Sequence, residues 1–150
     1  MSTNAFFPNI NPIQYEGPET DNILAFRYYD ENRLIGDKTM KEHLRFAIAY
    51  WHSFCNENSD PFGTGTRELP WAKHSDPMDV AKARLEAAFE FFTKINAPYY
   101  CFHDRDIAPE GSSVSESEKN LQEIVSLAKE HQQATGVKLL WGTANLFSHP

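Results

Sequence analysis

The sequence predicts an α/β fold in which three parallel strands alternate with two helices, preceded by an N-terminal arm. Three short runs of apolar and aromatic residues predict the strands, and two longer segments with a helical spacing of apolar residues lie between them. The first 38 residues show little periodicity and are rich in Asn, Pro, Asp and Glu. Continuous apolar runs are typical of parallel strands that are buried on both faces.

The N-terminal arm is expected over residues 1–38, and the α/β unit over residues 39–150. A stretch this long without periodicity is unusual inside a compact domain, so we expect the arm to anchor its scattered aromatic side chains on another surface. Thr39 and Glu42 have the spacing of a capping box, which predicts a short helix that starts at Met40.

The first two strands and the helix between them follow this short helix. Residues 46–54 form an apolar run too continuous for a half-exposed strand, so we expect a strand buried on both faces. After a loop over residues 56–75, Asp76 and Pro77 predict the start of a helix with one apolar face, which Pro98 ends. The second strand is expected directly after it, before a polar cluster at residues 103–106.

The second helix and the third strand complete the unit. Ser115 and Glu118 have capping-box spacing and predict the start of the second helix, which Gly136 ends. Residues 137–141 are the third strand. Three strands cannot close a barrel, which needs eight, so the unit looks incomplete.

Composition limits the partners that the chain can have. The net charge of −7 makes nucleic acid an unsuitable partner, because phosphate binding needs an excess of Lys and Arg. No apolar run reaches the length of a membrane span, and residues 1–4 lack the basic start of a secretory signal. Cys55 and Cys101 are far apart and without metal-type spacing, so we expect a cytoplasmic protein with reduced thiols in its core.

The carboxyl ends of the predicted strands carry the candidate site residues, since ligands of parallel α/β sheets bind there. His103 and Asp106 can form a His–Asp pair that moves a proton between sugar oxygens or coordinates a metal. The alternative is that the two residues cap the next loop. Trp51 and Trp141 could form a flat wall against which a sugar packs, although isolated aromatic residues more often belong to the core.

Phe62 lies between Pro and Gly on a predicted loop, and is expected to be either buried locally or inserted into a partner. The glycines and threonines of residues 63–66 lack the lysine and the spacing of a phosphate loop, which argues against nucleotide binding. His52 and Ser53 are adjacent on a predicted strand and would point to opposite faces, which excludes a serine–histidine pair.

Four stretches of the chain resemble the xylose isomerases, in particular the class with the longer N-terminal extension. They are WHSFC at residues 51–55, DPFGTGT at 60–66, CFHDRDIAPEG at 101–111 and LWGTANLF at 140–147. The resemblance covers essentially the whole chain and implies the N-terminal third of a (β/α)8, or TIM, barrel. It also accounts for the arm, which would be the N-terminal extension of that class.

The resemblance implies that the complete enzyme interconverts D-xylose and D-xylulose, and also D-glucose and D-fructose. His103 would bind the ring oxygen of the sugar and help to open the ring, with Asp106 orienting it. Trp51 and Trp141 would line the sugar pocket, and Thr143 would lie near His103 and the substrate.

Phe62 would reach into the active site of a neighbouring subunit, since the resemblance implies a homo-oligomer. Two divalent metals (Mg, Mn or Co) would polarise the sugar oxygens of the complete enzyme. The resemblance puts their ligands beyond Pro150, so we expect this chain to hold no metal and to be inactive alone. We also expect it to self-associate through its open sheet edges, with strands exchanged between copies or the fold rearranged. The alternative is a self-assembling structural α/β module that binds neither sugar nor metal.

Overall fold

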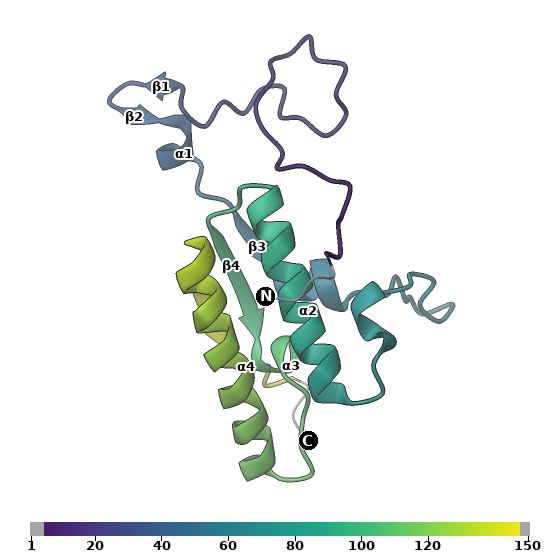
Figure 1. Ribbon diagram of the computed structural model, residues 1–150. Coiled ribbons are helices and arrows are strands. Elements are labelled where there is room, and N and C mark those ends of the chain that lie inside the picture. The colour runs from purple at the N-terminus through teal and green to yellow at the C-terminus, as the bar shows by residue number, and fades with distance from the viewer. Residues whose placement is uncertain (1–4, 148–150) are drawn as a thin grey trace.

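The computed structural model describes residues 5–147 and contains a three-stranded parallel sheet with two long helices (Figure 1). The strand order is β3-β4-β5, and the helices α2 and α4 connect consecutive strands. The bounds are β3 Ala47–Ala49, α2 Pro77–Lys94, β4 Tyr99–His103, α4 Val114–Thr135 and β5 Lys138–Thr143. The predicted α/β class is therefore confirmed, and the strands described form no closed barrel. Residues 1–4, in which no secretory signal is expected, and 148–150 lie outside the described residues.

The sheet register aligns the carboxyl ends of β4 and β5. β3 pairs with β4 from Ala47 opposite Tyr99, and β4 pairs with β5 as far as His103 opposite Thr143. A shift of register between Tyr100 and Cys101 interrupts the second pairing. The last residues of β4 and β5 consequently lie side by side.

Helix α2 is the helix whose start and end the sequence predicts correctly. The Asp76 side chain accepts hydrogen bonds from the backbone N–H groups of Met78 at 2.7 Å and Asp79 at 3.2 Å. Its apolar face buries Leu85, Phe89 and Phe92, among others, against the sheet and α4. The two helices run side by side (Figure 1).

The predicted start of α4 is wrong by two residues. Ser113, not Ser115, caps the helix, because its side-chain oxygen accepts a hydrogen bond from the Glu116 N–H at 3.2 Å. The end is as predicted: Gly136 has a φ of 77°, a left-handed conformation that closes the helix.

The first strand is much shorter than expected. β3 ends at Ala49, and the chain then turns into the single π-helical turn η1, Trp51–Cys55. The reason is packing: on a helical turn Tyr50 and Phe54 lie on the same side, both are buried, and their rings are 5.2 Å apart. We excluded a serine–histidine pair because His52 and Ser53 would point to opposite faces of a strand. Both residues lie in η1 instead, so that argument no longer applies.

The predicted burial on both faces is confirmed for the middle of β4, where Tyr100, Cys101 and Phe102 are buried, and is wrong for the other two strands. The residues of β3 are only half-buried, and every residue of β5 is exposed. The helices cover one face of the sheet, and β5 forms one of its edges. Leu140 is 54% exposed, and Trp141 is still 40% exposed although its ring meets that of Trp51 in η1.

The N-terminal arm is anchored on α2. Phe6 meets the ring of Trp71 edge-on at 6.3 Å, and Phe7 lies 5.9 Å from Phe91. Further along, the arm leaves the helices and enters the small hairpin of β1 (Leu34–Ile35) and β2 (Lys38–Thr39) (Figure 1). The predicted capping box of Thr39 and Glu42 is confirmed and starts α1, Met40–His43.

The predicted loop over residues 56–75 contains one short 3-10 helix, η2, Pro70–Lys73. It brings the Trp71 indole beneath η1, where Nε1 donates a hydrogen bond of 3.0 Å to the Phe54 carbonyl.

Cys55 and Cys101 are both free thiols. In residues 5–147 we find no helix with the length and hydrophobicity to cross a membrane.

Candidate functional site

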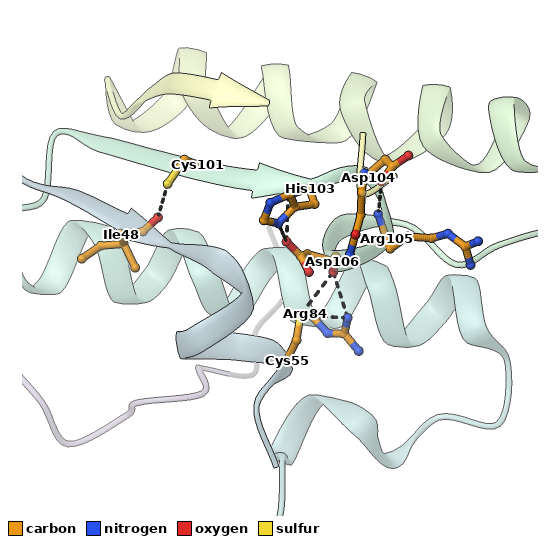
Figure 2. Close-up of polar contacts among 9 residues, drawn as sticks. Ile48, Cys55, Arg84, Cys101, His103, Asp104, Arg105 and Asp106 are labelled. Carbon is orange, nitrogen blue, oxygen red and sulfur yellow. Dashed lines mark hydrogen bonds and ion pairs between the residues drawn. The ribbon is translucent and has the colours of Figure 1, made fainter. Parts of the chain in front are cut away.

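His103 and Asp106 form a hydrogen-bonded pair at the carboxyl end of β4 (Figure 2). His103 is the last residue of the strand, and Asp106 lies in α3, Asp104–Ile107, a single turn that follows at once. His103 Nδ1 and Asp106 Oδ2 are 3.0 Å apart. The same oxygen accepts the His103 backbone N–H at 2.7 Å. The capping interpretation is therefore confirmed, and the same carboxylate also contacts the imidazole, whose action on a sugar stays a prediction.

The pair leaves one imidazole nitrogen available. The His103 side chain also lies where it can accept the Asp106 backbone N–H as the N-cap of α3. A carboxylate can only accept hydrogen bonds, so the contact between Nδ1 and Asp106 Oδ2 requires the proton of the neutral ring to lie on Nδ1. Nε2 then carries a lone pair, and it makes no hydrogen bond to any described residue. The His103 side chain is 28% exposed, whereas that of Asp106 is only 12% exposed. An imidazole held in this way can accept a proton from a hydroxyl group, or donate one after it is protonated.

Two indole rings flank the imidazole of His103. The ring centroid of Trp51 is 4.6 Å from that of His103 and 5.6 Å from that of Trp141. The His103 and Trp141 centroids are 5.6 Å apart. The two tryptophans thus form a partly exposed aromatic wall next to the His–Asp pair, although Trp51 lies on η1 and not on a strand.

Thr143 and Phe62 differ in their relation to this cluster. Thr143 is the last residue of β5 and pairs in register with His103, so its backbone belongs to the site. Phe62 lies on the loop before η2 and is 98% exposed. Its backbone N–H donates to Asp60 Oδ1 at 2.8 Å within a tight turn. The structure therefore brings five of the six predicted residues together and leaves Phe62 apart.

Asp104 is a site residue that the sequence analysis named only as part of a polar cluster. Its Oδ1 accepts the backbone N–H of Asn145 at 2.8 Å, which joins the segment after β5 to the end of β4. This bond keeps the ends of the two strands together. No sequence signal marks it, because the two residues are 41 positions apart.

Arg84 and Cys55 are two further residues that the sequence analysis missed. Arg84 Nη1 donates to the backbone carbonyl of Asp106 at 2.9 Å, and Cys55 Sγ donates to the same carbonyl at 3.4 Å (Figure 2). Burial raises the pKa of the Cys55 thiol to about 11, which keeps the sulfur protonated and able to donate. Burial also raises the pKa of the neighbouring Tyr50 well above its ordinary value.

The residues at this site do not fit a divalent metal ion. Within residues 5–147, no three His, Cys, Asp or Glu side chains come together in an arrangement that could hold one. His103 and Asp106 are already bonded to each other. We therefore assign no metal to this part of the chain.

The chain is similar to curated xylose isomerases over its whole length. That of Xanthomonas oryzae pv. oryzae is 59% identical over 150 residues, which are 100% of this chain and 34% of the relative. Those of Geobacillus thermodenitrificans and Caldanaerobacter subterraneus subsp. yonseiensis are 58% and 55% identical over 146 and 145 residues, in each case 97% of this chain and 33% of the relative. The chain thus spans about a third of the length of these relatives. No protein-family model matches it.

Proposed function

Since this chain is an N-terminal segment of the xylose isomerase family, we propose that it supplies the ring-opening and sugar-packing part of an aldose–ketose isomerase site. The observation that carries the proposal is the His103–Asp106 pair beside the indoles of Trp51 and Trp141. The substrates of the complete protein would be D-xylose and D-glucose.

His103 is the residue that acts on the sugar ring. With Nδ1 bonded to Asp106, its Nε2 is the atom that meets a bound pyranose. It can take the proton of the anomeric hydroxyl and return one to the ring oxygen, and this transfer opens the ring. Asp106 stabilises the imidazolium that forms in between, because its carboxylate lies 3.0 Å from Nδ1.

The two tryptophans hold the sugar. Indole faces are apolar and flat, and the C–H groups of a pyranose pack well against such a surface. Trp141 is 40% exposed, so this area is open to a ligand. Thr143, opposite His103 in the sheet, is suited to bind a sugar hydroxyl from the same edge.

Phe62 serves a second copy of the chain. An almost fully exposed phenyl ring on a loop tip is unfavourable in water, and insertion into an apolar pocket of a neighbouring subunit removes that cost. We propose that it reaches the sugar site of that neighbour in a homo-oligomer.

Isomerisation itself needs more than these residues. In the complete enzyme two divalent metals would supply Lewis-acid chemistry at the sugar oxygens, but the residues described here do not fit them. No step through a metal is therefore assigned to this chain. We propose that it contacts the sugar and has no isomerase turnover by itself.

Sugar binding tests the proposal. D-xylose titrated into the chain should shift the indole N–H resonances of Trp51 and Trp141 at millimolar concentration, while glycerol at the same concentration should not. The matched control is the Trp71 indole, which is buried and hydrogen-bonded below η1. Saturable shifts at Trp51 and Trp141, absent in His103→Ala, support the site. Equal or absent shifts at all three indoles contradict it.

A second candidate function is a self-assembling structural module. It is favoured by the exposed strand β5 and by four large apolar residues with much of their surface exposed: Leu140, Trp141, Leu146 and Phe147. An unpaired edge with apolar neighbours pairs readily with another chain. Sedimentation of the purified chain tests this, since a monodisperse monomer excludes it. Self-association without any response to xylose would favour it over the sugar site.

A further inference from the structure

Asp106 is held at its backbone as well as at its carboxylate. Helix α3 has only four residues, and the last carbonyls of a helix have no partner inside the helix. The Asp106 carbonyl is one of these groups. It accepts one hydrogen bond from Arg84 Nη1 at 2.9 Å and one from Cys55 Sγ at 3.4 Å. The two donors come from α2 and from the end of η1.

Arg84 directs its charge at this carbonyl and at nothing acidic. The ion pairs of residues 5–147 do not include it, and its Nε is buried without a hydrogen-bond partner. Arg84 Nη1 also lies 3.5 Å from Cys55 Sγ. A guanidinium without a carboxylate, on the inner side of a helix, is therefore used to bind one peptide carbonyl.

That carbonyl belongs to the residue that orients His103. Arg84 binds the backbone carbonyl of Asp106, and His103 contacts its carboxylate from the opposite direction (Figure 2). A cation at the last carbonyls of a helix also interacts favourably with the helix dipole. Loss of the guanidinium would let α3 shift, and with it the Asp106 carboxylate.

We propose that Arg84 is a positioning residue, which holds Asp106 so that its carboxylate keeps His103 in the Nδ1–H tautomer with Nε2 free beside Trp51 and Trp141. The inference rests on the function proposed above for the His103–Asp106 pair. Arg84 does not touch the sugar in this account. It acts through the peptide carbonyl of Asp106 alone.

The tautomer of His103 is the readout that separates this role from a general contribution to packing. We would label the histidines of the intact chain with ¹⁵N and read the protonated nitrogen of each ring by NMR at a pH where the rings are neutral. The variants are Arg84→Met, which removes the charge, and Arg84→Lys, which keeps a cation. Lys82→Met is the matched control, because Lys82 is a cation of the same helix that pairs with Glu123 at 2.7 Å instead.

The expected result is a single Nδ1–H tautomer of His103 in the parent chain and in Lys82→Met. In Arg84→Met the Nε2–H tautomer should rise at least about threefold, and Arg84→Lys should restore most of the original population. An unchanged tautomer in folded Arg84→Met would overturn the proposal. If Arg84→Met does not fold, Arg84→Gln, which keeps a donor without the charge, is read in the same way.

The result is independent of sugar binding. A chain that shows the tautomer response but does not bind xylose would refute the proposed function and leave the role of Arg84 intact. If the chain binds xylose but His103 keeps its tautomer in folded Arg84→Met, the role of Arg84 is refuted and the proposed function is supported.

Discussion

The anchor between the N-terminal arm and α2 leads to a quantitative prediction for Glu90→Ala. The Glu90 carboxylate accepts the backbone N–H groups of Phe6 at 2.7 Å and Phe7 at 3.1 Å. It also forms an ion pair of 3.1 Å with Lys94, one helical turn away. Lys94 in turn donates to the carbonyl oxygens of Phe7 at 2.5 Å and Ile10 at 2.6 Å. Removal of the carboxylate releases two donors and leaves Lys94 without its counter-charge.

The magnitude follows from these contacts. A hydrogen bond to a charged group contributes about 1.5–3 kcal/mol, and Glu90 makes two. The Glu90 side chain is only 19% exposed, so water replaces the lost partners poorly. We take the lower end of the range for each bond, since Phe6 and Phe7 lie in a segment without helix or strand. The cost is then about 3 kcal/mol, which is about a 150-fold increase in the opening of the arm.

Hydrogen exchange at the amides of Phe6 and Phe7 measures this opening directly, because these two N–H groups are the donors. We expect Glu90→Ala to lower their protection about 150-fold, and Glu90→Gln, which keeps one neutral acceptor, to lower it less. Glu86→Gln, one turn earlier on α2, is the control and should leave both amides protected. Protection in Glu90→Ala within about threefold of the parent chain would refute the reasoning.

Three further predictions concern stability. Burial lowers the pKa of His131, whose ring stacks on Phe89 at 4.9 Å, so the unfolded chain binds the proton more tightly and the free energy of unfolding should fall below about pH 6.5. Melting curves of His131→Gln from pH 8 to 5 should show a smaller fall than those of the parent chain. Trp71→Phe leaves the buried Phe54 carbonyl unpaired and should cost about 1–3 kcal/mol in urea unfolding, whereas a loss below about 0.5 kcal/mol would contradict this. Gly136→Ala requires an L-residue at a φ of 77° and should cost about 1 kcal/mol in the same assay, whereas no loss would argue against a strained position.

The parts of the fold that could be predicted are those with local signals. Asp76 and Pro77 mark the start of α2 and Gly136 marks the end of α4, because caps depend on residues a few positions apart. The start of α4 was ambiguous for the same reason. Ser113 with Glu116 and Ser115 with Glu118 both have capping-box spacing, so spacing alone does not select between them.

The turn η1 could not be predicted from periodicity. Its residues and those before it are apolar at nearly every position, and such a run fits a buried strand as well as a buried helical turn. Residues distant in the sequence stabilise the helical turn. Trp71 donates a hydrogen bond to the Phe54 carbonyl, and its ring packs on that of Phe54 at 5.7 Å.

In the candidate site, too, contacts between residues close in the sequence could be predicted and contacts between distant residues could not. The His103–Asp106 pair is three residues apart, so its contact could be predicted from spacing. The contact of Arg84 with Asp106 joins two residues 22 positions apart, and a single arginine in a helical pattern carries no signal of its own. The roles of Trp51, Trp141, Thr143 and Phe62 on a sugar remain predictions.

The central claim is that this chain carries the ring-opening pair and the aromatic wall of an isomerase site but not the means to isomerise a sugar. The most direct test is D-xylose to D-xylulose turnover by the purified 150-residue chain with added Mg²⁺, Mn²⁺ or Co²⁺, measured beside its intact mass. The account predicts no turnover above the buffer control. Robust turnover at the mass of 150 residues, abolished by His103→Ala, would contradict it, because the chain would then contain a metal site that residues 5–147 do not show.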